Sequence, residues 1–397
     1  MKAKYNSSRI SERMQYISPF HVMDLLAQAK QLEADGHDVI HLEVGEPDFA
    51  TPQAINNAAI EAIKSGRTKY TPATGLPELK QKIASYYQQR LNTLLNPENI
   101  MITPGASGAL QLALTVLVDR GQSVLMADPG YPCNRHFVRL LDACAQSIAV
   151  GESSQYQLTH ELIAQHWQEN TAAVLIASPS NPTGTLIDRD EMQKIIEVVE
   201  SKNGVLLVDE IYQGLVYEQA DFSAASLSRN IFVINSFSKF FTMTGWRLGW
   251  LIVPDDFIEP VDRLAQNLFL APPTISQYAA LSAFENDTLA VLDNQRDELN
   301  KRRQFLLKGL INLGFDIPVK PGGAFYIYAN VSKFTHNSFD FCNALLHQSH
   351  VAITPGIDFG EHKASQHVRF AYTQNIEKLQ LALDRISDFL TLYKDSH

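Results

Sequence analysis

A lysine, two serines and an arginine lie close together in the segment from Ser236 to Gly249. Ser236 and Ser238 come just before the lysine, Lys239, and Arg247 follows it. A lysine that condenses with an aldehyde must lose its proton for part of the time, and a desolvated position near other cations lowers its pKa. Hydroxyl and guanidinium groups are donors suited to a phosphate. The segment therefore predicts a nucleophilic amine beside a phosphate site.

One small molecule, pyridoxal phosphate, carries an aldehyde and a phosphate on the same ring and would satisfy both parts of this segment. Asp209 directly follows the apolar run 205–208, which places a carboxylate at the end of a predicted strand. A carboxylate beside the pyridine nitrogen keeps the ring protonated and makes it a better electron acceptor. Tyr212, three residues further on, offers a phenol to the oxygen of the ring. The alternatives are a helix N-cap or a surface charge for Asp209 and an ordinary core position for Tyr212.

Other loops that follow predicted strands offer groups to the same ligand. Asn181 lies between two prolines, and its amide is expected to donate to the ring oxygen. Tyr131, in another proline-rich loop, is expected to stack on the ring, although simple packing explains it equally well. The turn 103–110 leads from a strand into a helix, where backbone N–H groups and the helix dipole favour a phosphate. The small residues expected to contact it are Ala106, Ser107 and Gly108.

Arg369 lies in an apolar run, 367–373, near the end of the chain. Period-two alternation puts Val368 and Phe370 on one face of the predicted strand and Arg369 on the other. An arginine among apolar neighbours suits the bidentate binding of a carboxylate. A charge on an edge strand that faces water is the alternative, and the sequence leaves both open.

The composition sets limits on the kind of protein. Its 397 residues are 45% hydrophobic, and the net charge is -10. That length indicates about two domains, and the absence of a basic block argues against a nucleic-acid surface. The longest apolar runs are too short to span a bilayer, and the polar N-terminus does not resemble a secretion signal. The few scattered cysteines, Cys133, Cys144 and Cys342, predict no metal cluster and suggest reduced thiols in the cytoplasm.

The order of apolar runs predicts an α/β protein. Nearly continuous aliphatic runs separated by helical stretches are typical of a mostly parallel sheet covered by helices, which binds ligands at the carboxyl ends of its strands. These runs are 100–103, 123–127, 173–177, 205–208 and 231–234. We therefore expect a large cofactor-binding domain of this kind over residues 46–290.

A different pattern begins near residue 290. A charged helix at 294–310 precedes strand-like runs at 323–328, 351–354 and 367–373. These elements indicate a smaller α+β unit. The first part of the chain, with a helix at 20–36 and a strand at 39–44, is expected to pack with it. The predicted small domain thus comprises residues 1–45 and 291–397.

Taken together, these segments resemble the class I/II aminotransferases of the fold-type I superfamily of pyridoxal-phosphate enzymes. The resemblance extends from about residue 20 to the C-terminus. It is carried by the segments 178–184, 208–212 and 236–249, and the segments 44–49 and 69–75 match the N-terminal pattern of the family. It implies an enzyme that moves an amino group between an L-amino acid and a 2-oxo acid.

The resemblance also implies roles for the matching residues. Lys239 would form the Schiff base with the cofactor and move the proton, and Asp209 would pair with the pyridine nitrogen. Arg369 would hold the α-carboxylate of the substrate, with Gly45 and Asn181 as further substrate-binding residues. In this family the tyrosine that matches Tyr70 reaches the phosphate of the neighbouring subunit's cofactor, which implies a homodimer with its active sites at the interface.

Some features leave the substrate and the reaction open. Phe20 stands where a serine is common in the family, and Ser107 stands where aspartate-type relatives often have a lysine or a larger side chain. No second arginine stands out for a distal carboxylate. A carbon–sulfur β-lyase shares the same lysine, aspartate and arginine and is the alternative function.

Two other relatives fit less well. An acyl-transferring relative typically has a histidine where this chain has Tyr212. A regulator that senses effectors with such a domain would carry an additional DNA-binding domain, and the ~40 residues before Gly45 are too few for one.

Overall fold

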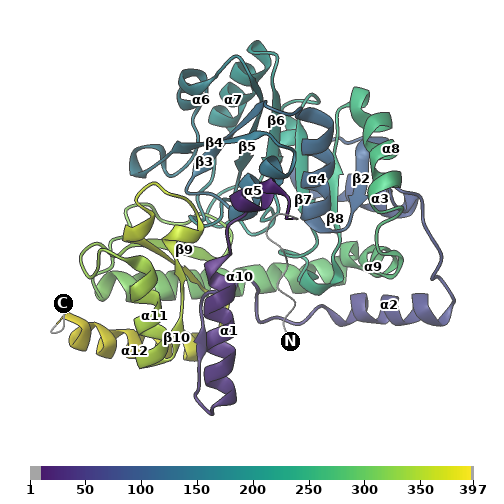
Figure 1. Cartoon of the computed structure of the whole chain (residues 1–397). Helices are drawn as coiled ribbons and strands as arrows, with labels where there is room; N and C mark the ends of the chain where they lie inside the picture. The colour runs from purple at the N-terminus through teal and green to yellow at the C-terminus, as the bar shows by residue number, and fades with distance from the viewer. Residues whose placement is uncertain (1–9, 395–397) are drawn as a thin grey trace.

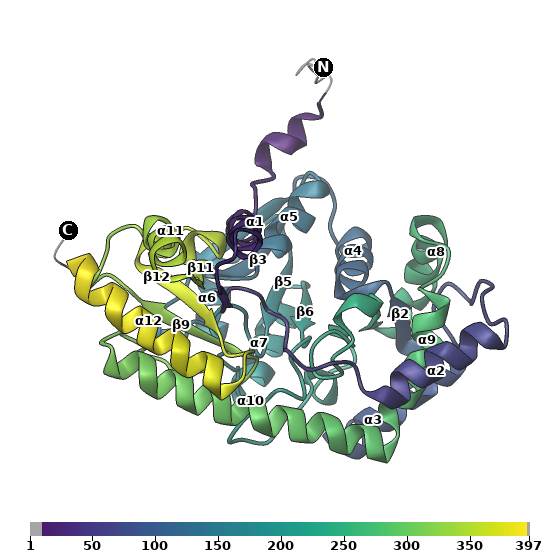
Figure 2. The same cartoon turned by 90° about the horizontal axis from the view of Figure 1, so that it is seen from below.

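The computed structural model describes residues 10–394 and shows a larger and a smaller lobe (Figure 1). The long helix α10 (Asn286–Asn312) runs along both lobes, as Figure 2 shows from below. This helix begins eight residues before the predicted helix at 294–310 and crosses the expected domain boundary at residue 290. Among residues 10–394, no helix has the length and apolar character needed to cross a membrane.

The larger lobe is built on a seven-stranded sheet with the order β2-β8-β7-β6-β5-β3-β4. Only β8 is antiparallel to its neighbours, so the predicted α/β architecture with a mostly parallel sheet is confirmed. The strands are β2 (Ile100–Thr103), β3 (Ser123–Asp128), β4 (Cys144–Ala149), β5 (Thr171–Ala177), β6 (Val205–Asp209), β7 (Phe232–Ser236) and β8 (Gly249–Ile252).

The apolar runs are continuous because both faces of this sheet are covered. Val174 and Ile176 of β5 pack into one hydrophobic cluster, and Ala173 and Leu175 pack into another. Alternation along a strand sends these pairs to opposite faces. The helices of this lobe are α2 (Gln53–Lys64), α3 (Pro77–Leu91), α4 (Gly105–Leu117), α5 (Pro132–Leu140), α6 (His160–His166), α7 (Arg189–Ser201), α8 (Ile258–Leu268) and α9 (Thr274–Ala280).

The smaller lobe contains an antiparallel sheet with the order β11-β12-β9. Its strands are β9 (Tyr326–Asn330), β11 (Thr354–Pro355) and β12 (His367–Ala371), and its helices are α11 (Ser338–Ser349) and α12 (Ile376–Lys394). The beginning of the chain joins this lobe through α1 (His21–Ala34) and through β1 (Ile40–His41), which pairs in parallel with β10 (Val351–Ala352).

The strand expected at 39–44 is shorter in the structure than in the prediction. Only Ile40 and His41 form it, and the backbone beyond Leu42 runs toward the carboxyl ends of the central strands. This departure matters, because Glu43, Val44 and Gly45 then line a cavity there instead of extending a sheet.

Candidate active site

A cavity of about 260 Å³ lies at the carboxyl ends of the central strands and is lined by residues of both lobes. Most of the site residues predicted from the sequence line it. They are Gly45, Ala106, Ser107, Tyr131, Asn181, Asp209, Tyr212, Ser236, Ser238, Lys239, Arg247 and Arg369. Two predicted residues do not: Gly108 is buried in α4, and Tyr70 lies on the surface with 83% of its area exposed.

Lys239 follows β7 and directs its amine into this cavity. Its Nζ donates a hydrogen bond to the carbonyl oxygen of Gly45 at 2.8 Å and lies 5.6 Å from the centre of the Tyr212 ring. Burial, helped by the guanidinium groups of Arg369 and Arg247, lowers the pKa of Lys239 to about 8. A lowered pKa increases the fraction of neutral, nucleophilic amine near neutral pH.

Asp209 ends β6 and is 4% exposed. Its Oδ1 accepts a hydrogen bond from the backbone N–H of Ile211 at 3.1 Å. Burial raises the pKa of Asp209 to about 7, although this N–H and the Lys239 amine act in the opposite direction. A cationic N–H donor in the cavity would therefore stabilise the ionised carboxylate, because a nearby positive charge lowers a carboxyl pKa.

Another part of the cavity lining combines a helix N-terminus with Arg247. Ala106 and Ser107 lie in the first turn of α4, and Gly105 begins that helix with a φ of 71°. A Cβ atom added at Gly105 would lie 2.8 Å from Nη2 of Arg247, so the guanidinium packs directly over this glycine. Arg247 is held by a hydrogen bond from Nη1 to the carbonyl oxygen of Thr244 at 3.1 Å. Backbone N–H groups and a guanidinium in this arrangement suit a phosphate.

Arg369 occupies the middle strand of its sheet, and only 4% of its area is exposed. The alternative of a water-facing charge on an edge strand is therefore wrong. Its Nη1 donates to Oδ1 of Asn181 at 2.8 Å, and its Nη2 donates to the carbonyl oxygen of Glu43 at 2.6 Å. The Nε atom is buried and has no hydrogen-bond partner among the described residues. This leaves a guanidinium N–H unsatisfied, a feature expected of an anion site.

Tyr326 of β9 belongs to this cavity but was not among the predicted site residues. Its hydroxyl lies 2.9 Å from that of Tyr212, and its ring lies 4.2 Å from the guanidinium carbon of Arg369. The hydroxyl also occupies the space that a Cβ atom would take at Gly45, so only glycine fits there. The sequence marks 323–328 merely as a strand, and no local signal shows which of its aromatic rings faces the site.

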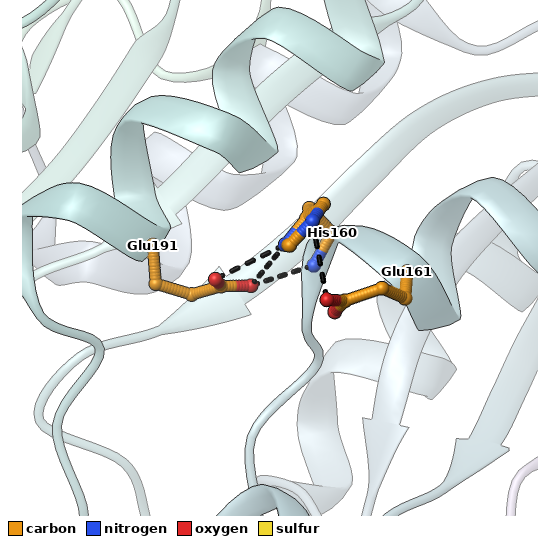
Figure 3. Close-up of side chains that lie close together, drawn as sticks. All are labelled: His160, Glu161 and Glu191. Carbon is orange, nitrogen blue, oxygen red and sulfur yellow. Dashed lines mark hydrogen bonds and ion pairs between the residues drawn. The ribbon is translucent and has the colours of Figure 1, made fainter.

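A second group of ionisable side chains lies in the larger lobe on α6 and α7 (Figure 3). Nδ1 of His160 lies 2.9 Å from Oε1 of Glu191, which also accepts the backbone N–H of His160 at 2.7 Å. Nε2 of the same ring lies 3.2 Å from Glu161. The two carboxylates thus lie at opposite nitrogens of one imidazole. This arrangement connects α6 to α7.

The chain is similar to known aminotransferases over nearly its whole length. The pattern of the aminotransferase class I and II family matches residues 37–386. A (5-formylfuran-3-yl)methyl phosphate transaminase of Methanocaldococcus jannaschii is 39% identical over 96% of this chain and 99% of its own length. A valine–pyruvate aminotransferase of Mycobacterium tuberculosis is 38% identical over 94% of this chain and 97% of its own length.

Solved structures agree with this result. The crystal structure of an aminotransferase from Mycobacterium tuberculosis superimposes with a TM-score of 0.94 at 38% identity, over 97% of this chain and 99% of that one. The aspartate aminotransferase from Thermus thermophilus with maleate gives a TM-score of 0.90 at 30% identity, over 96% of this chain and 99% of that one.

Proposed function

This chain belongs to the class I and II aminotransferases, and we propose that it uses Lys239, in the cavity described above, to transfer amino groups between an L-amino acid and a 2-oxo acid. The family depends on pyridoxal phosphate, and we propose that this chain binds that cofactor. The main support is the set of groups around one cavity: an amine of lowered pKa, a buried carboxylate and two guanidinium groups.

The donors and acceptors of the cavity fit the cofactor. Arg247, the N-terminus of α4, Ser236 at the end of β7 and Ser238 just after it would hold its phosphate. Asp209 would accept a hydrogen bond from the N–H of the pyridinium ring. The positive charge of that ring would favour the ionised form of its buried carboxylate. The side-chain oxygen of Asn181 accepts a hydrogen bond from Arg369, so its NH₂ group can donate one to the ring oxygen. The phenol of Tyr212 would donate a second hydrogen bond to the same oxygen. Tyr131 would stack on the ring.

The residues of the chain then divide the reaction among them. When bound, pyridoxal phosphate supplies an aldehyde that captures the amino group and a ring that accepts electrons from Cα. Arg369 holds the α-carboxylate with its planar fork and so orients the Cα–H bond. The Nζ atom of Lys239 would take the proton from the substrate Cα and donate it to the former aldehyde carbon of the cofactor. Asp209 keeps the ring nitrogen protonated. Gly45 lets Tyr326 and the substrate approach the backbone closely.

We also propose the assembly and the location of the protein. The exposed Tyr70, together with Ile60 and Ile63 on the projecting helix α2, supports a homodimer in which Tyr70 reaches the phosphate in the partner subunit (Figure 1). Residues 46–290 would form the cofactor-binding domain, with 1–45 and 291–397 as the small domain. The scattered cysteines support a cytoplasmic location.

The test of this function is transamination by the purified protein with pyridoxal phosphate. An amino acid alone should convert the cofactor to its amine form in a single turnover and release a 2-oxo acid, and a second 2-oxo acid should reverse the change. Release of pyruvate, ammonia and a thiol from cystathionine, with no requirement for a 2-oxo acid and without amine-form cofactor, would instead identify the β-lyase alternative.

Replacing Arg369 with lysine should raise the Michaelis constant of the amino donor by about 10–100-fold, because lysine lacks the planar fork and each hydrogen bond to a charged group contributes about 1.5–3 kcal/mol. Steady-state kinetics would measure this change. Arg303→Lys is the matched control, since Arg303 is also buried but contacts Pro321 and Glu218 outside the cavity. An unchanged constant in Arg369→Lys would exclude the carboxylate role.

Replacing Gly105 with alanine should raise the dissociation constant of the cofactor by about tenfold, because the new Cβ atom displaces Arg247 from a charge-assisted contact with the phosphate. Fluorescence titration of the apoprotein would measure it. Gly121→Ala is a close control, since Gly121 also has a positive φ (82°) but its Cβ would meet nothing within 4 Å. Equal effects of the two substitutions would show that backbone strain, and not Arg247, is responsible.

A further inference from the structure

We propose that the preferred amino donor of this site carries an apolar side chain, which the first turns of α1 and Val44 bind directly. This inference rests on the proposed function, because it takes Lys239 and Arg369 as the groups that hold the reacting end of the substrate. It adds the class of substrate, which the family as a whole does not fix.

The cationic side chains that line the cavity already have roles. They are Lys239, Arg247 and Arg369. Arg247 lies over Gly105 at the phosphate end, and the Arg369 guanidinium is bonded to Asn181 and Glu43 at the other. With the substrate's amino group at Lys239 and its carboxylate at Arg369, the side chain must extend toward the remaining wall of the cavity.

That remaining wall is apolar. Phe20, Met23 and Leu26 all line the cavity; Met23 and Leu26 lie on one face of α1, and Phe20 directly precedes that helix. Val44, from the segment that follows β1, lines it as well. Met23 leaves 55% of its area exposed, although it faces the cavity from the first turn of the helix. A bound aliphatic or aromatic side chain would remove this area from water.

The position of this wall is fixed by hydrogen bonds. The backbone N–H groups of His21 and Val22, at the start of α1, donate to the carboxylate of Asp358 at 2.9 and 2.8 Å. Asp358 is buried next to β12, the strand that carries Arg369. The apolar face of α1 and the carboxylate anchor are therefore held to the same lobe, as a binding pocket for one substrate requires.

The charges along the cavity act against an acidic side chain. Besides its three cations, the described lining contains two carboxylates, Asp209 and Glu43. The Oε2 atom of Glu43 is buried without a hydrogen-bond partner among the described residues. A second carboxylate on the donor would lose water and would meet no unassigned cation among the described lining residues of this chain, both of which disfavour its binding.

Competition between donors tests this inference. With the holoenzyme, single-turnover kcat/KM values for leucine, methionine and phenylalanine should exceed those for aspartate and glutamate by about 100-fold, with alanine between the two groups. A value for aspartate or glutamate equal to or above the apolar donors would overturn the inference while leaving the proposed function intact. Failure of every donor, alanine included, would overturn the proposed function and this inference with it.

Binding of unreactive analogues separates recognition from chemistry. By calorimetry, 4-methylpentanoate should bind the holoenzyme at least about tenfold more tightly than glutarate, since only the first lacks a distal charge. Equal affinity, or tighter binding of glutarate, would contradict an apolar subsite.

A charge placed on the wall tests its location. Met23→Arg should shift the ratio of kcat/KM for glutamate over leucine by at least about tenfold toward glutamate. Leu381→Arg is the matched control, because Leu381 is similarly exposed but lies on α12, away from the cavity. An unchanged ratio in Met23→Arg, with normal folding by circular dichroism, would show that α1 does not contact the side chain.

Discussion

Replacing Lys239 with alanine is expected to lower the rate of transamination by about 10⁴-fold, because the same amine carries the cofactor and moves the proton from Cα. The cofactor should still bind, since Arg247 and the N-terminus of α4 are unchanged. Rapid-mixing absorbance with a good amino donor measures the proton-transfer step. An added small amine should partly restore the rate of the variant, because it replaces the missing base without restoring the covalent attachment.

Lys80→Ala is the control for this experiment. Lys80 is also a buried lysine, with 6% of its area exposed, but it lies on α3 and pairs with Glu98 outside the cavity. Its loss should leave turnover within a few-fold of normal. Near-normal turnover in Lys239→Ala would show that another group abstracts the proton.

Replacing Asp209 with asparagine is expected to lower turnover by about 10²–10³-fold, a loss typical of removing one preorganised charge from an active site. Asparagine has nearly the same shape but carries no charge to hold a proton on the pyridine nitrogen. The absorption spectrum of the bound cofactor should respond to pH differently in the variant, and the cofactor should bind more weakly. Measurements of kcat, cofactor affinity and spectrum together distinguish this electrostatic role from general damage to the fold.

Glu210→Gln is a close control for Asp209→Asn. Glu210 is the next residue, is also buried, and has a pKa raised to about 8 by burial. Its carboxylate accepts hydrogen bonds from Ser223 and Ala224 and does not line the cavity. Glu210→Gln should keep most of its activity. If both variants lose activity equally, the loss comes from structural damage at the end of β6 and not from the missing charge beside the ring nitrogen.

The opposite pKa shifts of Lys239 and Asp209 have one main cause. Burial disfavours charge, so it lowers the pKa of the amine to about 8 and raises that of the carboxyl to about 7. A neutral amine and an ionised carboxylate are the forms that the proposed chemistry requires. The pyridinium group of the cofactor would favour the ionised form of Asp209, whereas the shift of Lys239 already favours the neutral form.

Much of the site could be predicted because parallel sheets collect functional groups at one edge. Asp209 ends β6, Lys239 follows β7 and Asn181 follows β5, and all three come together in the cavity. Most of the central strands could be predicted because a strand buried on both faces consists of consecutive apolar residues. β4 was missed because it lies at the edge of the sheet, and its residues are mostly small or polar and partly exposed. β8 was missed because it is short and begins at Gly249, the last residue of the conspicuous segment, so that only three of its residues lie beyond that segment.

Contacts between the lobes could not be predicted in the same way. The sequence left Arg369 open between an anchor and a surface charge, because its burial depends on β11 and β9, which flank β12 in space. Tyr326 fits against Gly45, a residue far away in sequence, and no local pattern records that contact. The sequence marked Phe20 as a departure from the family pattern. It gave no sign that Met23 and Leu26 also line the cavity, because that depends on how α1 packs against the rest of the protein.

The most direct measurement is the position of the covalent cofactor label. Borohydride makes the bond between the cofactor's aldehyde carbon and a protein amine irreversible, so peptide mapping by mass spectrometry locates that amine. We predict one pyridoxyl group per chain, on Lys239, and none in Lys239→Ala. A label on another lysine, such as Lys80, or no label in the holoenzyme, would contradict the account.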